Sequence, residues 1–394
     1  MWIAPTAIML CSLLSYIDRQ VLAVLSPTIL AETHMTAYDY GWVVACFSIF
    51  YTIGNPLLGA MLDYIGLRKG MLIAVGIWTL ASTSHAWVTG FIGFAMARAV
   101  LGFGEGAAFP GAFRTAADAL PPTKRMRGTA LGYSGASLGA ILTPLAVRPI
   151  AAMYGWRPAF LITGALGLLW LAIWFTVARP PYLPGNIKRA SAIAWPNPFE
   201  RRFWLTVSSF GLGAVALGVV AYFSPLYLSR VYHLSQDEVL KVVWIPTVGW
   251  ELGYFFWGWV NDKWNVEMKD RTAPRRIFLL LTLLTMPILL ALFIHSLVAT
   301  LALLFWATFI ADGFVVTTLR VGARIYPAAQ IGLVAGIGSS SWGLVQALVQ
   351  PMYGKLVDLN RFDEIFISMA VLPVIGTAIW LWLSRDEKLW AQVD

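Results

Sequence analysis

The chain has 394 residues, of which 59% are hydrophobic and only 12% charged, and its mean hydropathy is +0.70. These proportions exclude a soluble globular domain of this size and predict a protein that crosses a membrane many times. The formal net charge of +8 would suit a nucleic-acid-binding protein. The basic residues lie mostly in short loops between apolar segments, however, which argues against a nucleic-acid partner.

Apolar segments long enough to cross about 30 Å of hydrocarbon as helices recur along the whole chain. In chain order we expect them at residues 3–30, 40–62, 69–88, 90–113, 127–150, 157–178, 203–229, 240–261, 275–294, 297–320, 330–354 and 363–384. The sequence therefore predicts an all-α integral membrane protein with twelve transmembrane helices in two pseudo-symmetric six-helix bundles. The predicted parts are an N-terminal bundle (1–178), a cytoplasmic linker (179–202) and a C-terminal bundle (203–394).

The distribution of Lys and Arg predicts how the chain is oriented. Of the 28 basic residues, 20 follow even-numbered spans, six follow odd-numbered spans and two lie within spans. By the positive-inside rule this bias places both termini in the cytoplasm. The compact loops suit a bacterial inner (plasma) membrane, and we expect a monomer there.

Cysteine and histidine give no sign of a disulfide framework or a metal site. Cys11 and Cys46 both fall within predicted spans, where small apolar packing residues are expected. All four histidines (His34, His85, His233 and His295) fall near outer helix ends, where we expect solvated side chains. We therefore expect neither a metal nor a cofactor.

Four charges lie inside the predicted membrane spans of the N-terminal half. Asp18 and Arg19 stand together in the first span, where each charge costs roughly 2.5 to 3.5 kcal/mol on insertion scales. Arg98 and Glu105 are seven residues apart, so they share one face of a helix, about 10 Å apart along its axis. The two arginines and two acids nearly cancel, and we expect all four to face one cavity.

These residue types suit anion binding coupled to a proton. A planar guanidinium matches a carboxylate bidentately, which makes Arg19 the expected clamp for an anionic substrate. A carboxylate in a poorly hydrated cavity can exchange its arginine partner for a proton, so Glu105, paired with Arg98, is the expected coupling group. A fixed structural ion pair is the alternative interpretation of Arg98 and Glu105.

The two halves of the chain repeat one another. Ser26-Pro27 recurs as Ser224-Pro225 after 198 residues, and the Gly59-x-x-x-Asp63 turn recurs as Gly258-x-x-x-Asp262 after 199. Parallel repeats of this kind are typical of secondary transporters, in which the substrate site lies at midplane between the halves.

The turn after the second span carries a family resemblance. Its pattern, Gly59-x-x-x-Asp63-Tyr64-x-Gly66-x-Arg68-Lys69, resembles the helix 2–3 signature of the major facilitator superfamily, except at Tyr64, where a basic residue is usual. A carboxylate beside a glycine turn and two cations can pair with a neighbouring helix in one gating state only; anchoring at the membrane interface is the alternative. The candidate gating residues are Gly59, Asp63, Gly66, Arg68, Lys69 and Asp262.

Within that superfamily, further motifs resemble the anion:cation symporters. They are Tyr16-Ile17-Asp18-Arg19, Tyr51, Arg98-x-x-x-Gly102-x-Gly104-Glu105-Gly106 and Gly155-Trp156-Arg157, with a looser likeness to hexuronate carriers around Trp244 and Glu251. The resemblance implies that Arg19 binds substrate, that Asp18 and Glu105 couple protons, and that Arg98 partners Glu105. It also implies import of an organic anion, most of all a sugar acid such as a hexuronate or hexonate, by proton-coupled symport with alternating access.

The C-terminal half has apolar residues where the repeat would place Asp18 and Arg19, namely Ala216 and Leu217. We therefore expect it to contribute uncharged hydrogen-bonding groups to a hydroxyl-rich substrate. The candidate substrate-binding residues are Arg19, Tyr51, Tyr222, Ser340 and Gln346.

Some questions stay open in the sequence. Glu251 and Asp312 fall near the centres of their spans, either as a second proton site or as structural, protonated groups. An anion exchanger or a uniporter is an alternative to a symporter. An intramembrane enzyme is a weaker alternative, because the sequence shows no nucleophile–base pair, metal cluster or phosphate loop.

Overall fold

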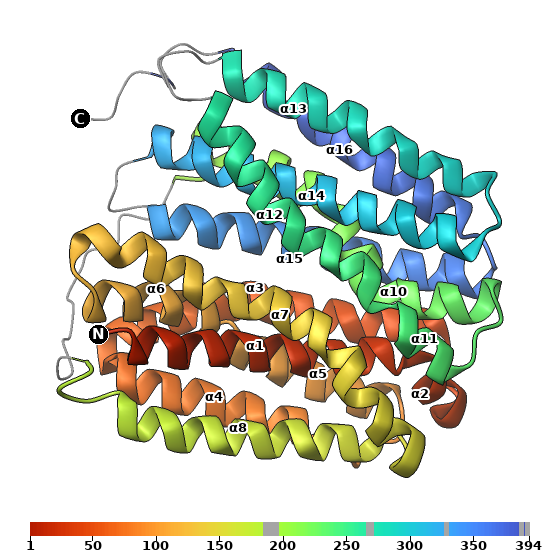
Figure 1. Ribbon diagram of the computed structural model, residues 1–394, viewed down its shortest axis with the longest axis horizontal. Coiled ribbons are helices and arrows are strands. Elements are labelled where there is room, and N and C mark those ends of the chain that lie inside the picture. Colours follow the sequence, from red (N-terminus) through yellow and green to blue (C-terminus); the bar gives the residue numbers. More distant parts are fainter. Residues whose placement is uncertain (184–196, 265–271, 327–330, 386–389, 391–394) are drawn as a thin grey trace.

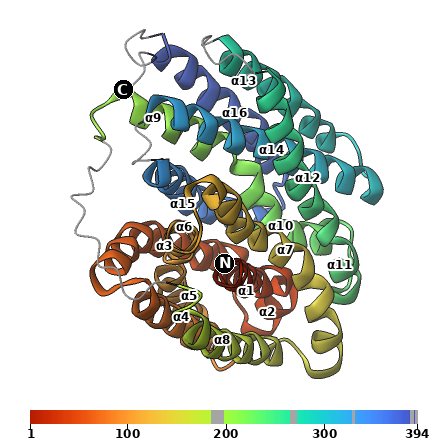
Figure 2. The same ribbon diagram turned by 60° about the vertical axis from the view of Figure 1, so that its left-hand side comes forward.

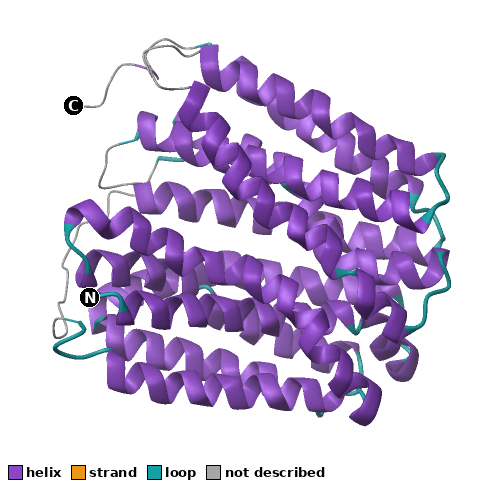
Figure 3. Cartoon of the chain, in the orientation of Figure 1, coloured by secondary structure: helices purple, strands orange, loops and turns teal. Residues whose placement is uncertain are grey.

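A computed structural model of the chain describes residues 1–183, 197–264, 272–326, 331–385 and 390, and these residues are helical almost throughout (Figure 3). The helices of the first half are α1 (Ile3–Val24), α2 (Ser26–Thr33), α3 (Ala37–Ile65), α4 (Leu67–Ser84), α5 (Phe91–Glu105), α6 (Ala108–Ala119), α7 (Pro122–Tyr154) and α8 (Arg157–Val177). Those of the second half are α9 (Arg201–Val207), η1 (Ser208–Leu212), α10 (Val215–Val231), α11 (Gln236–Val242), α12 (Trp244–Trp264), α13 (Thr272–Thr285), η2 (Met286–Leu292), α14 (Leu297–Ile325), α15 (Ile331–Asp358) and α16 (Asp363–Leu383).

When directly continuous helices are joined, the described residues form twelve spans, which confirms the predicted all-α membrane fold. Nine helices of the described chain are long and apolar enough to cross a membrane by length and composition alone. The spans outside that set are α4, α12 and α15. Polar side chains within them, such as Arg68 in α4 and Glu251 in α12, lower their hydropathy.

Several predicted spans that are continuous in the sequence pattern are broken in the structure, among them the first and the fourth spans. The first breaks at Leu25, because Pro27 has no N–H to donate to the carbonyl of Ala23. The Ser26 hydroxyl donates to that carbonyl instead, at 2.8 Å. The fourth span breaks at Gly106, where a Cβ would lie 2.5 Å from the backbone nitrogen of Asn55, so only glycine permits this approach of α5 to α3.

The first eight α-helices and the last eight occupy opposite sides of the molecule (Figures 1 and 2), and the N-terminus and the C-terminal end of α16 lie at the same end, which we call the terminal end. The opposite end, which carries α2 and α11, is called the α2 end. Helices α3 and α15 pack against each other across the two halves, as do α7 and α12. Most of the predicted linker lies outside the described residues, at 184–196, so its bounds stay a prediction.

The prediction of solvated histidines is wrong for His85. This side chain is fully buried, its ring is stacked 5.1 Å from the ring of Phe160, and its Nδ1 lies 2.8 Å from the carbonyl oxygen of Ala81. The residue follows α4 directly, and the aromatic rings of α5 and α8 cover that end of the helix. Sequence position alone could not show that two neighbouring helices extend past it.

Candidate functional site

A buried ion pair joins α1 to α5 in the middle of the N-terminal half. The Nε of Arg19 donates to Glu105 Oε2 at 2.5 Å, and the hydroxyl of Ser15 donates to the same oxygen at 2.8 Å. Ser15 precedes Arg19 by one helical turn and therefore shares its face of α1. The Arg19 side chain is 3% exposed and that of Glu105 is 0% exposed. Removal of either partner would leave an uncompensated charge in a dry site, which costs about 3 to 5 kcal/mol.

Aromatic rings surround the guanidinium of Arg19. Its central carbon lies 4.5 Å from the ring centroid of Tyr51, 4.6 Å from that of Tyr16 and 4.9 Å from that of Phe47. Such cation–π contacts stabilise a cation that has left water. The Nη2 of Arg19 has no hydrogen-bond partner among the described residues. The guanidinium is therefore fixed by Glu105 and by aromatic faces, with one amino group left to donate.

Asp18 points away from Arg19, toward the interior of the N-terminal half. The hydroxyl of Ser82 on α4 donates to Asp18 Oδ1 at 2.6 Å and lies 3.1 Å from the hydroxyl of Thr163 on α8. Consecutive residues on a helix differ in direction by about 100°. Arg19 therefore meets α5, whereas Asp18 meets α4 and α8, and Asp18 remains within electrostatic range of Glu105 and Arg98.

The arginine that pairs with Glu105 is not the one predicted from the sequence. Glu105 is paired with Arg19, whereas Arg98 donates from Nη2 to the backbone carbonyl of Arg19 at 3.2 Å. Arg98 and Glu105 lie on the same face of α5, but their spacing of seven residues separates the groups by about 10 Å along the axis. Arg19 crosses from α1 at the level of Glu105 and takes the place that the sequence assigned to Arg98.

The C-terminal half presents Tyr222 and Gln346 to this region. Tyr222 on α10 lies within electrostatic range of Arg19 and Arg98, and its carbonyl accepts a hydrogen bond from the hydroxyl of Tyr40 on α3 at 3.0 Å. Gln346 is fully buried on α15 and lies against Gly218, one turn before Tyr222. The structure thus brings Tyr222 to the Arg19 region and places Gln346 beside it.

The remaining predicted substrate residues lie along the same interface. Tyr51 contacts the Arg19 guanidinium and faces Gly343 of α15, where a Cβ would lie 3.9 Å from its ring. Ser340, one turn earlier on α15, accepts a hydrogen bond at its carbonyl from the Thr52 hydroxyl at 3.4 Å. Ser340 therefore contacts the other half through its backbone.

Trp250 also reaches the site from the C-terminal half. Its ring meets Tyr16 edge-on at 5.5 Å, across the two halves, and its buried Nε1 has no hydrogen-bond partner among the described residues. Tyr254, one turn further along α12, is 37% exposed and within electrostatic range of Tyr16 and Tyr133 in the N-terminal half. Trp250 could be predicted from the sequence, because it lies one repeat spacing after Tyr51. No sequence pattern indicated Tyr254.

The two candidate gating acids occupy equivalent positions in the two halves. Asp63 on α3 is paired with Arg114 on α6, and Asp262 on α12 is paired with Arg320 on α14. Arg114 also donates to the carbonyl of Leu62 at 2.6 Å. Neither arginine is among the gating residues predicted from the sequence. Their spacing of 206 residues, close to that of the other repeated motifs, was the signal that could have found them.

The other candidate gating residues surround the first of these pairs. Gly66 ends α3 with φ of +91°, a conformation that favours glycine. Arg68 donates to the carbonyl of Phe175 on α8 at 3.0 Å and lies 4.7 Å from the centroid of that ring. Gly59 lies against Pro110 at ordinary contact distance, and Lys69 is exposed. Arg68 thus ties α4 to α8 within the N-terminal half.

Polar contacts between the halves gather at the α2 end. Gln236 of α11 accepts from the Thr28 hydroxyl at 2.7 Å and donates to the carbonyl of Val24 at 2.7 Å. Asp358, at the end of α15, accepts from the backbone N–H groups of Ala37 and Tyr38 at 2.9 and 2.8 Å.

An ion pair closes the same end. Arg148 of α7 is paired with Asp237 of α11 at 2.6 Å, and Arg148 and Lys241 together lower the pKa of Asp237 to about 2. No inter-half hydrogen bond among the described residues lies near the paired Asp63 and Asp262. Among the described residues, the ion pair and most of the polar contacts between the halves therefore lie at the α2 end, with the Thr52–Ser340 hydrogen bond further along α3 and α15.

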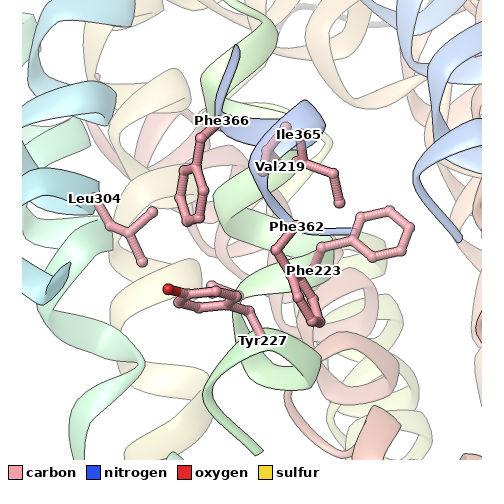
Figure 4. Close-up of a pocket in the computed structure, with 8 residues that line it drawn as sticks. Val219, Phe223, Tyr227, Leu304, Phe362, Ile365 and Phe366 are labelled. Atoms are coloured by element: carbon pink, nitrogen blue, oxygen red, sulfur yellow. The ribbon is translucent and has the colours of Figure 1, made fainter. Parts of the chain in front are cut away.

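A separate cavity in the C-terminal half is apolar (Figure 4). It is lined by Val219, Phe223, Ser224, Tyr227, Leu304, Phe362, Ile365 and Phe366. The Ser224 hydroxyl is already bonded to the carbonyl of Val220 at 2.5 Å, and no charged side chain lines the space. A carboxylate has no cationic partner in this space, whereas the interface around Arg19 offers one.

Two structurally repeated halves of membrane-spanning helices, locked at one end and carrying buried charges near the contact between them, define a polytopic membrane transporter. The sequence profile of the Major Facilitator Superfamily matches residues 8–348. The chain therefore belongs to this superfamily, and it is a transporter and not an enzyme.

Relatives of known function agree with this family. The chain is 24% identical to a hexuronate transporter of Escherichia coli strain K12 over 412 aligned residues, which cover 98% of the chain and 94% of the relative. It is 27% identical to a D-galactonate transporter of Escherichia coli strain CFT073, covering 95% and 93%.

The fold agrees with a solved structure. A bacterial homologue of the human lysosomal transporter Spinster, in an inward-facing and occupied conformation, superposes with a TM-score of 0.81 at 17% identity and covers 99% of the chain and 98% of its own. At this identity the likeness shows the fold alone.

Proposed function

We propose that this protein imports a sugar acid, a hexuronate or hexonate, across a bacterial inner membrane by proton-coupled symport, as a monomer with both termini in the cytoplasm. The named relatives carry hexuronate and D-galactonate, which supports this substrate class. The observation that carries the proposal is the state of Arg19: its charge is neutralised by Glu105, while Nη2 is left without a partner among the described residues.

Charge balance at Arg19 connects the anion to the proton. A substrate carboxylate that binds the guanidinium bidentately needs two of its N–H groups, and Glu105 Oε2 already holds Nε. When the substrate displaces Glu105, that buried carboxylate loses its cation and must take up a proton. One negative charge and one proton then enter together, and the net charge of the site does not change.

The hydroxyl groups of a sugar acid match the uncharged atoms around Arg19. Trp250 Nε1, Gln346 Nε2 and Gln350 Oε1 are buried and have no partner among the described residues. An indole N–H and an amide N–H donate, and an amide oxygen accepts, so the set suits a polyhydroxylated chain. Buried groups of this kind discriminate strongly against a ligand that leaves them unpaired.

With the termini in the cytoplasm, the α2 end faces outward and the described conformation is closed to the outside. The Asp63 and Asp262 pairs then lie at the cytoplasmic end, each within its own half. Alternating access would break the Gln236, Asp237 and Asp358 contacts and form new contacts at the terminal end.

Uptake into proteoliposomes tests the proposal. Radiolabelled galacturonate and galactonate are expected to accumulate when the outside is more acidic than the lumen, and Arg19→Lys is expected to reduce uptake at least tenfold, because an ammonium lacks the planar fork. Arg361→Lys, at an exposed position, is the matched control. Uptake that equilibrates but never accumulates would indicate a uniporter or an exchanger, and absence of uptake for every sugar acid would refute the substrate class.

The Glu105→Gln variant separates coupling from transport. It is expected to lose accumulation driven by the pH gradient and to retain counterflow exchange, since glutamine mimics the protonated acid. Loss of counterflow together with accumulation would contradict the coupling role of Glu105.

A further inference from the structure

The C-terminal half contains a carboxyl group that the Arg19 site does not use. Asp312 lies in the middle of α14 and is fully buried, and neither of its carboxylate oxygens has a hydrogen-bond partner among the described residues. A buried ionised carboxylate without a partner costs several kcal/mol, whereas a neutral carboxylic acid costs far less. Asp312 in these surroundings is therefore the neutral, protonated acid.

The groups that face Asp312 offer it no positive charge. Helix α14 packs against α9, η1, α10, α12, α13, η2 and α15. Among their described residues, the titratable groups within electrostatic range of Asp312 are Glu251 and Tyr254, both on α12. Glu251 is half-buried and carries the same charge as an ionised Asp312. No cation holds Asp312 in its ionised form here, and its acidic neighbour opposes ionisation further.

The position of Asp312 connects it to the interface between the halves. A Cβ at Gly253 of α12 would lie 3.0 Å from the Cβ of Asp312, so the acid is adjacent to the backbone of this helix. The next residue along, Tyr254, is partly exposed and faces Tyr16 and Tyr133 of the other half. One turn earlier, Trp250 contacts Tyr16, which in turn contacts the Arg19 guanidinium. Asp312 therefore packs against the stretch of α12 whose side chains Trp250 and Tyr254 lie near the other half.

We propose that Asp312 is a second proton-binding site, located in the C-terminal half and occupied in the described conformation. When the halves separate at the α2 end, the contact between Trp250 and Tyr16 breaks and water reaches the acid past Tyr254. There an ionised Asp312 takes up a proton from a hydronium ion of the outside water. The acid keeps this proton while the α2 end is closed, and it returns the proton to cytoplasmic water, leaving a carboxylate, when water reaches it from the terminal end. One proton per cycle is thereby carried in addition to those coupled at the Arg19 site. The inference rests on the proposed proton symport.

Equilibrium accumulation measures the number of protons directly. Proteoliposomes receive radiolabelled galactonate under a pH gradient of one unit, with the membrane potential clamped to zero by potassium and valinomycin. Each coupled proton multiplies the accumulation ratio by about ten under this gradient, because one pH unit corresponds to one factor of ten in proton activity. Asp312→Asn, which is neutral at every pH, is expected to lower the ratio about tenfold and to retain counterflow.

Control variants make the result decisive. Glu364→Gln removes an acid from the exposed start of α16 and is expected to keep the wild-type ratio. If Asp312→Asn does not fold, Asp312→Ser, a smaller neutral variant, is expected to give the same tenfold fall. A wild-type ratio in either folded variant would overturn the proposal and show that the proton on Asp312 is structural. A wild-type protein that does not accumulate galactonate at all would instead refute the proposed symport.

Discussion

Gly354→Ala is expected to prevent the two halves from closing at the α2 end. A Cβ at Gly354 would clash with the carbonyl oxygen of Ala37 and lie 2.8 Å from both the carbonyl carbon of Ala37 and the Cα of Tyr38. All three are backbone atoms of the first turn of α3, so no side-chain rotation can relieve the overlap. The helices α3 and α15 must move apart, and with them the backbone groups that Asp358 binds.

The size of the effect follows from the overlap. Insertion of one carbon into a tightly packed contact costs about 1 to 3 kcal/mol. In the conformation that is open at the α2 end, the same methyl group meets no opposing helix. The whole free-energy cost of the overlap therefore destabilises the closed conformation relative to the open one. A difference of this size shifts the equilibrium roughly 5- to 150-fold toward the conformation that is open at the α2 end.

Spin-label distances measure this shift. Labels at Ala31→Cys and Leu359→Cys, two exposed positions on opposite halves of the α2 end, are placed in a background in which Cys11 and Cys46 are serine. Gly354→Ala is expected to move most of the distance distribution to longer values and to slow uptake.

Gly76→Ala is the matched control, because a Cβ at Gly76 meets nothing within 4 Å. It is expected to leave both the distances and the uptake unchanged. A Gly354→Ala distribution identical to that of the wild type would refute the reasoning that this glycine permits closure.

Three further outcomes are expected. Ser82→Ala removes the hydrogen bond to Asp18 at 2.6 Å and should lower the free energy of unfolding by about 1 to 3 kcal/mol, measurable as a lower thermal midpoint in detergent; an unchanged midpoint would contradict this contribution. The pKa of Asp237 is lowered from 3.8 to about 2. The ionised Asp237 therefore stabilises the closed conformation fully above pH 3.8, and this stabilisation is lost only as the pH falls toward 2. Spin-label distances at the α2 end should accordingly be equal at pH 7 and pH 5. Arg320→Gln frees Asp262 and should change the interconversion between conformations without changing substrate affinity, which binding of galactonate to solubilised protein checks.

The spans could be predicted from the sequence because hydrophobic length decides them. Twelve apolar segments correspond to twelve helical spans, and the structure differs from the prediction mainly in breaks within some of the spans. The break at Leu25 could have been placed from Pro27, whereas the break at Gly106 depends on how closely α3 approaches, a property of the packed molecule. Sequence periodicity contains no information on that approach.

The members of the candidate site were predictable, but their partners were not. Asp18, Arg19 and Glu105 could be selected because buried charges are rare in membrane spans. Their pairing depends on the rotation and height of α1 relative to α5, which brings Arg19 level with Glu105 and turns Asp18 toward Ser82. The roles assigned to these residues in binding and coupling stay predictions for the transport assays.

The contact between Asp358 and α3 has a consequence for how sequences of this protein can vary. The atoms that Asp358 binds are backbone N–H groups, the first two donors of α3, while the third donor is satisfied by the Thr36 side chain within the helix itself. Every residue except proline supplies such a donor. The exposed residue 38 can therefore vary without weakening this contact, whereas the buried Ala37 is limited by its packing, and comparison of related sequences would show no correlated change between residue 38 and Asp358. A contact that helps to hold the two halves together is thus fixed by helix geometry on one side and by a single carboxylate on the other.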